Sequence, residues 1–262
     1  MRFSTIATAA MAATGAAAAH QHSHARLHDR RAAREAELKV GAELKAANNL
    51  QDRSVVGDVL LAVEDQVKVL AKGLASIGQN AVSSANAEVW IGSDGKWTNT
   101  YHNQADDDCV LVVWGSAGSW VNAKAPLVTV SIPAGQNKTL SFADGASGAW
   151  AVMYNDTELI NGQISQTWGE YTFGEYGVVD VSREVNMQGH NMTIQTPNCV
   201  TDMETCVFVC KDTSSISCWL EYELKNCENG SQEGANKGTY AGADSGGCGN
   251  MGDSADLHTY VG

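Results

Sequence analysis

The chain has 262 residues, a formal net charge of −13 and seven cysteines. The negative charge is concentrated after residue 85: residues 86–262 hold 7 Lys and Arg against 22 Asp and Glu, a net charge of −15. Such a domain repels nucleic acids and anionic membranes, so binding to nucleic acid and insertion into membranes are not expected. The remaining partner classes are neutral sugars, cations and other proteins.

The first residues predict secretion. Met1-Arg2 is a short basic start, residues 7–19 are apolar and uncharged, and Ala17-Ala18-Ala19 forms a small-x-small cleavage pattern. This order is typical of a signal peptide, and the apolar run is too short to span a bilayer. We therefore expect residues 1–19 to be removed and the protein to be secreted.

Residues 20–53 form a basic tail or pro-segment rich in His and Ala, with Arg30-Arg31 as a dibasic processing site. Cleavage after Ala19 would expose His20-Gln21-His22, which presents an amine, amides and an imidazole, a set that favours square-planar Cu(II) or Ni(II). Processing at Arg31 would remove His20 and His22. No cofactor is expected. A copper brace of the kind found in oxidative polysaccharide enzymes is not expected either, because more than 60 residues separate His20 from the first strand.

Residues 54–85 are predicted to hold one amphipathic helix and a linker. Apolar residues recur at alternating spacings of four and three and form one stripe over 54–78: Val56, Leu60, Val63, Val67, Leu70, Leu74 and Ile77. One interpretation is a helix packed on its own domain, and the other is a coiled-coil or partner helix that mediates self-association. The linker-like composition of residues 79–87 predicts that the helix is separable from the following domain.

From Glu88 onward the pattern indicates short strands. Apolar or alternating runs are separated by turn residues, of which Asp144-Gly145 is the clearest. Many short strands with little helical periodicity predict an all-β sandwich or barrel over residues 86–262. The runs are Val110–Trp114, Leu127–Ile132, Thr139–Phe142, Trp150–Tyr154, Tyr171–Phe173, Val178–Val181 and Met192–Ile194.

Cysteines and glycosylation sequons agree with a secreted protein. Six cysteines crowd into a loop-rich stretch that cannot bury much apolar surface, which predicts disulfides and leaves one of the seven thiols over. A zinc cluster is the weaker alternative, since no CxxC or matching His pair follows. The cysteines are Cys109, Cys199, Cys206, Cys210, Cys218, Cys227 and Cys248. The sequons begin at Asn137, Asn155, Asn191 and Asn229.

Several segments, in order, resemble the thaumatin-like family. The matching segments are His102-Asn103 with Cys109 and Val112–Gly115, Ile132–Gly135 with Thr139–Phe142, Gly148–Trp150, Thr167–Phe173, Asp180–Ser182 and Gly189–Ile194. The run TWGEYTFGEYGVVDVSREVNM, followed by CVTDMETCVFVC, is similar to a secreted fungal allergen group, the Asp f four type. The resemblance covers about residues 88–230 and implies a thaumatin-like β-sandwich with a disulfide-rich loop region. It also implies that Cys109 pairs with Cys248.

The resemblance further implies an acidic cleft that binds β-1,3-glucan. Glu170 and Asp180 match two of the family's acids, and Glu184 lies nearby. The family's Arg is missing around Gly148–Trp150, and Gln188 stands where an Asp is expected. Because part of the set is absent, binding is favoured over hydrolysis. The carbohydrate-binding candidates are Glu170, Asp180, Glu184, Glu175, Tyr171 and Trp168, with Tyr176 beside them.

These patterns favour a secreted glycoprotein of the allergen or effector kind that binds cell-wall β-glucan or proteins outside the cell. Two alternatives remain. One is a weak endo-β-1,3-glucanase that uses Glu170 and Asp180, since glycoside hydrolysis needs a pair of carboxyl groups. The other is a module that interacts with host proteins through the helix at 54–78.

Overall fold

The structure is a computed structural model that describes residues 61–218 and 220–262. Three expected features lie outside the described residues: the signal peptide, the basic tail with His20 and His22, and the first part of the helix. In the part described, one helix, α2 (Val63–Ala71), is followed along the chain by short strands. None of its helices is long and apolar enough to cross a membrane.

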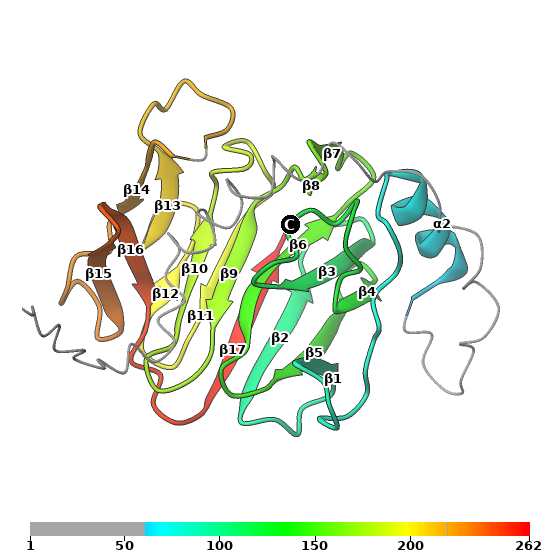
Figure 1. Ribbon diagram of the computed structural model, residues 1–262, viewed down its shortest axis with the longest axis horizontal. Coiled ribbons are helices and arrows are strands. Elements are labelled where there is room, and N and C mark those ends of the chain that lie inside the picture. Colours follow the sequence, from blue (N-terminus) through cyan, green and yellow to red (C-terminus); the bar gives the residue numbers. More distant parts are fainter. Residues whose placement is uncertain (1–60, 219) are drawn as a thin grey trace, which may run out of the picture.

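Two large mixed sheets form the body of the described chain (Figure 1). The first sheet has six strands in the order β1-β5-β2-β17-β11-β12: β1 (Val89–Ile91), β5 (Asn137–Phe142), β2 (Trp97–Asn103), β17 (Ala255–Val261), β11 (Met192–Gln195) and β12 (Val200–Thr201). Its β17 pairs in parallel with β2.

The second sheet runs in the order β14-β13-β10-β9-β6-β3-β4, and β15 and β16 extend it beside β10. Its strands are β14 (Tyr222–Lys225), β13 (Val207–Cys210), β10 (Val178–Ser182), β9 (Trp168–Thr172), β6 (Ser147–Met153), β3 (Cys109–Gly115), β4 (Val128–Ile132), β15 (Ala235–Tyr240) and β16 (Ala243–Cys248). A small hairpin joins β7 (Leu159–Ile160) to β8 (Gln163–Ile164).

The main core lies between the two sheets. Trp97 and Tyr101 of β2 meet Trp150 of β6 and Tyr171 of β9, and all four side chains are buried. The Tyr101 ring contacts Trp150 edge-on, with ring centroids 5.4 Å apart, and Trp150 stacks on Tyr171 at 5.5 Å. The expected all-β sandwich is confirmed, because alternate residues of strands from both sheets fill one continuous apolar layer.

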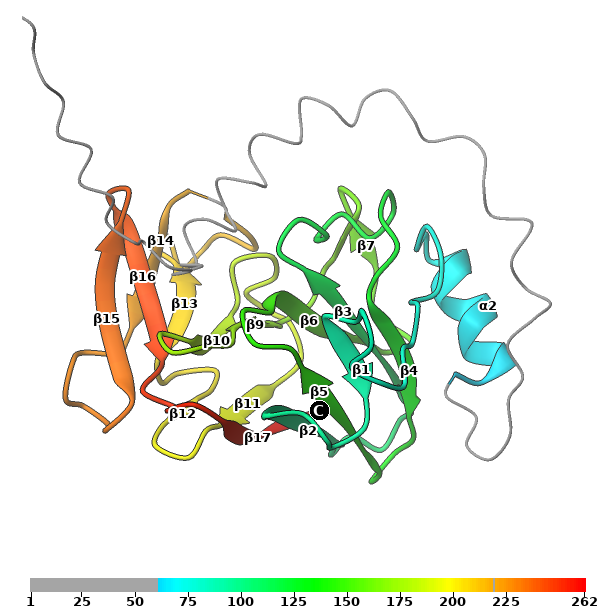
Figure 2. The same cartoon turned by 60° about the horizontal axis from the view of Figure 1, so that its bottom comes forward.

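Helix α2 covers the outer face of the second sheet. Val69 and Leu74 are buried in a second cluster with Val110, Val112 and Trp114 of β3. Figure 2 shows the helix beside β4, at the end of the sandwich opposite the β15–β16 hairpin. The described part of the apolar stripe therefore packs on its own domain. The expectation of a separable helix, free to bind a partner helix, is wrong for these residues.

The helix ends at Ala71 rather than at residue 78. Gly73 has φ +107°, a backbone conformation that stops a helix, and the Leu74 amide donates to the Val69 carbonyl at 3.1 Å. The expected linker at 79–87 also runs along the sheet: the Asn80 side chain donates to the Thr129 carbonyl at 2.9 Å and accepts from the Thr129 amide at 2.7 Å. Packing against β4 thus begins before residue 86.

Candidate functional site

The two acids matched by resemblance lie directly opposite each other. Asp180 of β10 pairs with Glu170 of β9 in the antiparallel register, so their side chains emerge on the same face. This is the outer face of the second sheet, since Tyr171, the next residue on β9, points into the core between the sheets. We call Trp168, Glu170, Asp180 and Ser182 the acidic strip.

The acidic strip is closed to solvent. Glu170 is 2% exposed, Asp180 is 3% exposed, and Glu184, which follows β10, is fully buried. The structure thus brings together the acids predicted from the sequence, but as buried side chains rather than in an open cleft. The motif predicts which carboxylates are neighbours, whereas their burial is a feature of the folded chain that the motif does not contain.

The aromatic candidates divide between two environments. Tyr171 belongs to the main core, where its hydroxyl donates to the Trp114 carbonyl at 3.3 Å. The expectation that Tyr171 contacts a sugar is therefore wrong. Trp168 is buried against Trp114 and donates from Nε1 to the Ile164 carbonyl at 2.8 Å. Glu175 and Tyr176 stand exposed in the β9–β10 turn, where a hydrogen bond to Glu175 raises the pKa of Tyr176.

Arg183 is the sole arginine in the described residues, and it does not replace the missing family Arg. Its guanidinium donates to the main-chain carbonyls of Met203 at 3.1 Å and Met187 at 2.6 Å. Those bonds fix the loop after β10, which carries Gln188 on its exposed side. Arg183 thus has a structural role in that loop.

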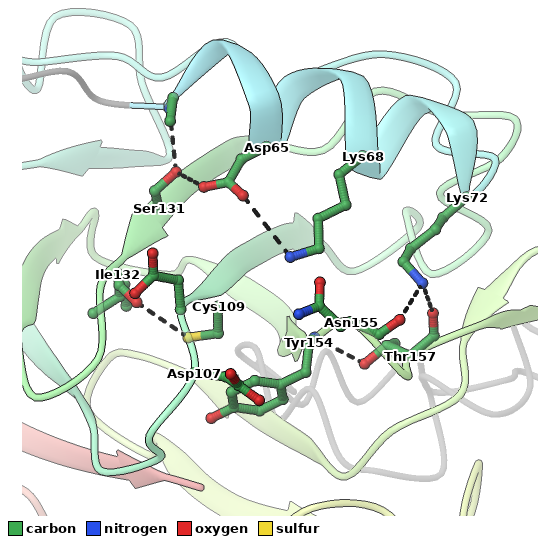
Figure 3. Close-up of polar contacts among 12 residues, drawn as sticks. Asp65, Lys68, Lys72, Asp107, Cys109, Ser131, Ile132, Tyr154, Asn155 and Thr157 are labelled. Atoms are coloured by element: carbon green, nitrogen blue, oxygen red, sulfur yellow. Dashed lines mark hydrogen bonds and ion pairs between the residues drawn. The ribbon is translucent and has the colours of Figure 1, made fainter.

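An open pocket lies elsewhere, between α2 and the loop that joins β2 to β3 (Figure 3). We call it the helix pocket. It has a volume of about 440 Å³ and is lined by Glu64, Asp65, Lys68, Asp106, Asp107, Asp108 and Asn155. The lining combines carboxylates, an ammonium and an amide, and apart from Asp65 and Lys68 these residues are exposed. No sequence pattern predicts this pocket, because its residues come from three separate segments.

Two polar contacts hold the helix side of the pocket. Ser131 on β4 donates from Oγ to Asp65 Oδ2 at 2.5 Å, and the other Asp65 oxygen lies 3.9 Å from Lys68 Nζ. One turn further on, Lys72 Nζ donates to the carbonyls of Asn155 at 2.9 Å and Thr157 at 2.6 Å (Figure 3). These bonds fix the helix relative to the β6 end of the sheet.

Buried Asn103 shapes the acidic loop on the other side. Its amide donates to the carbonyls of Asp107 at 2.8 Å and Ile132 at 2.9 Å, and its oxygen accepts from the Ala105 amide at 3.1 Å. The Tyr154 hydroxyl donates to the same oxygen at 3.2 Å. Because Asn103 satisfies four partners, the three consecutive aspartates after it are presented on a fixed turn.

Cys109 lies beneath this loop as a free, buried thiol. Its Sγ faces the Ile132 carbonyl at 3.7 Å (Figure 3). Burial raises the pKa of Cys109 to about 12, and burial also raises the pKa of neighbouring Tyr154. A thiol with such a pKa is neutral and unreactive at physiological pH.

The disulfides differ from the expected pairing. Cys248 is bonded to Cys199, not to Cys109. The expected Cys109–Cys248 bond is therefore wrong: Cys109 begins β3 between β4 and β6, whereas Cys248 ends β16 beside β10. The other bonds are Cys206–Cys227 and Cys210–Cys218. The alternative of a zinc cluster is not supported, because six of the seven cysteines form disulfides and so offer no thiolate to a metal.

The four sequon asparagines, Asn137, Asn155, Asn191 and Asn229, are all exposed. Asn155 stands at the rim of the helix pocket. Their glycosylation stays a prediction. The copper-binding tail with His20 and His22 also stays a prediction, since it lies outside the described residues.

The fold and its bonds define a class: a disulfide-stapled, acidic β-sandwich of the kind that persists in oxidising compartments. Within that class, the family model for the Allergen Asp f 4-like domain matches residues 86–240. The chain therefore belongs to the Asp f 4-like allergen family, which confirms the resemblance noted in its sequence.

Two solved structures are similar to parts of the chain. The protein elicitor MoHrip2 from Magnaporthe oryzae is 13% identical, with a TM-score of 0.33, and the match covers 63% of this chain and 98% of that one. The thaumatin-like xylanase inhibitor TLXI is 10% identical, with a TM-score of 0.30, and the match covers 62% and 97%. Comparison with curated proteins finds no match.

Proposed function

We propose that this allergen-family protein acts outside the cell as a non-enzymatic binding protein for cell-wall β-1,3-glucan, with the helix pocket as the binding site. The observation that carries the proposal is the mixed polar lining of the open pocket. Sugar hydroxyls both donate and accept hydrogen bonds, and the pocket offers acceptors on Asp106 and Asp107, a donor on Lys68 and both functions on Asn155.

The closed acidic strip argues against hydrolysis. Cleavage of a glycosidic bond needs the polymer, and a water in the inverting case, to enter between two carboxyl groups held about 5–9.5 Å apart. Glu170 and Asp180 face each other in register, but their exposed fractions of 2% and 3% are those of buried side chains rather than of an open cleft. We therefore assign the protein binding without hydrolysis.

The test is a pulldown of the full chain with insoluble β-1,3-glucan particles. Hydrogen bonds to charged groups contribute about 1.5–3 kcal/mol each, so replacing two carboxylates should lower affinity at least about tenfold. We compare wild type with a pocket variant, Asp106→Asn with Asp107→Asn, and a strip variant, Glu170→Gln with Asp180→Asn. Asp253→Asn, at an exposed acid away from both places, is the matched control.

We expect wild type, the strip variant and the control to sediment with the glucan, and the pocket variant to stay in the supernatant. Loss of binding in the strip variant alone would show that the protein binds glucan at the acidic strip and not in the helix pocket. If all four proteins stay in the supernatant, the proposed function is wrong. Release of soluble sugar by wild type would overturn the non-enzymatic assignment.

A second candidate function is binding to a basic segment of an extracellular protein. It is favoured by the charge of the domain, −15 over residues 86–262, and by the carboxylates of the helix pocket. Electrostatic binding weakens as salt rises, whereas hydrogen bonding to a neutral sugar does not depend on it strongly. A partner that binds in low salt and is released at about 0.5 M salt, with no retention on glucan, would favour this second function.

A further inference from the structure

Two histidines meet on the outer face of the six-stranded sheet, far along the chain from each other. His102 is on β2 and His258 is on β17, and the strands pair in parallel with His258 opposite Thr100. The inward neighbours Tyr101 and Leu257 are buried in the main core. His102 and His258 therefore point outward, where each remains partly exposed.

The two imidazoles touch through ring nitrogens. His102 Nε2 lies 3.0 Å from His258 Nδ1. Tyr260 stacks on His102 with ring centroids 4.7 Å apart and planes 15° apart, while the two histidine rings stack at 5.3 Å. The stacking restricts rotation of the His102 ring, so the two nitrogens are held close together before any ligand arrives.

A carboxylate stands behind the second histidine. Asp256, also on β17, accepts a hydrogen bond from Thr98 at 2.6 Å through Oδ1, and its Oδ2 lies 3.9 Å from His258 Nε2. The carboxylate lies on the Nε2 side of His258, and Nδ1 is the nitrogen that faces His102. Carboxylate, histidine and metal commonly occur in this order in metal sites.

We propose that His102 and His258 bind a divalent transition metal ion, Cu(II) in the first place, at the surface of β2 and β17. Imidazole nitrogens bind copper at about 2.0 Å, so two nitrogens 3.0 Å apart subtend an angle of roughly 95° at a shared ion. This angle matches adjacent corners of a square plane, the geometry that Cu(II) prefers, and is smaller than the tetrahedral angle of zinc. Water completes the shell on the open side.

Uncharged residues stand opposite both ligands on the adjoining strands. The neighbouring strands contribute no competing cation at the pair, since residues opposite the histidines are Asn137 on β5 and Gln195 on β11. The pair shares no residue with the helix pocket.

The test uses the full chain with His20, His22, His24 and His28 replaced by Gln, here called the tail-silenced chain. It keeps three histidines: His102, His190 and His258. His190 is the matched control, because it is also partly exposed and bonded to a carboxylate, at 2.8 Å from Asp156. Cu(II) binding is measured by titration calorimetry, and electron paramagnetic resonance counts the coordinating nitrogens.

We expect the tail-silenced chain to bind one Cu(II) with two imidazole nitrogens. His102→Ala or His258→Ala should lower affinity at least tenfold and remove one nitrogen from the spectrum, and Asp256→Asn should lower affinity by about tenfold through His258. His190→Ala should change neither. Equal affinity of both pair variants and the parent would overturn the site.

A second measurement does not depend on the variants folding. Cu(II) broadens the NMR signals of nearby rings, so one equivalent added to the tail-silenced chain should broaden His102, His258 and Tyr260 first. Broadening of His190 first, with the pair unaffected, would overturn the proposal.

Discussion

Val69 is the position at which docking of α2 on the sheet can be measured most directly. Its side chain is 0% exposed and packs in the second cluster with β3. Val69→Ala removes two carbons, about 1.6 kcal/mol of transfer free energy at about 0.8 kcal/mol each. The unfilled space adds to this, for a total loss of about 2–3 kcal/mol. At about 2–4 °C per kcal/mol for a domain of this size, the melting temperature should fall by roughly 4–12 °C.

Val67→Ala is the control on the same helix, because Val67 is 61% exposed. Its stability should stay within about 0.5 kcal/mol of wild type. The assay is urea unfolding under non-reducing conditions, followed by tryptophan fluorescence, since Trp114 and Trp168 lie in the same cluster as Val69. If Val69→Ala is as stable as Val67→Ala, the helix does not dock on the sheet and the reasoning is refuted.

Two further predictions concern the cysteines. Replacing Cys199 and Cys248 by Ser should cost about 4 kcal/mol, against about 2.5 kcal/mol for Cys210 and Cys218, because the bonds close loops of 49 and 8 residues; equal losses in calorimetry would contradict this chain-entropy ranking. Cys109 should titrate near pH 12 in the fold and near 9 when unfolded. The contribution of its neutral thiol to the free energy of unfolding is therefore complete below pH 9 and is lost as pH rises through 12. Cys109→Ala should make the alkaline fall in unfolding free energy shallower by about 1.4 kcal/mol per pH unit in that range, and an unchanged slope would count against a buried neutral thiol.

The strands were predictable from the sequence because their pattern is local. The alternation over Leu127–Ile132 corresponds to β4, and Thr139–Phe142 falls within β5. The turn at Asp144-Gly145 is present, with Gly145 at φ +80°. The sequence predicts too long a helix because the apolar spacing continues through Leu74 and Ile77, whereas the backbone angle at Gly73 ends the helix.

Only the part of the site that lies on two strands adjacent in the sequence was predictable. Glu170 and Asp180 are close in sequence and join one hairpin, so their pairing followed from the motif. The helix pocket and the histidine pair join segments separated by dozens of residues or more, and periodicity within a segment carries no information about such contacts. The resemblance alone predicts a Cys109–Cys248 bond, whereas Cys109 is free and Cys248, on β16 beside β10, is bonded to Cys199.

The position of β17 has a consequence for synthesis of the protein. This strand lies between β2 and β11, and contacts such as Thr98 with Asp256 span 158 residues. At about 5–20 residues per second, a ribosome needs roughly 10–30 s to make that interval. During this time β2 has an unpaired edge, and β11 has one from the moment it is made; such an edge is the feature through which strands associate with the wrong chain. Folding factors that shield strand edges should therefore raise the yield of this protein.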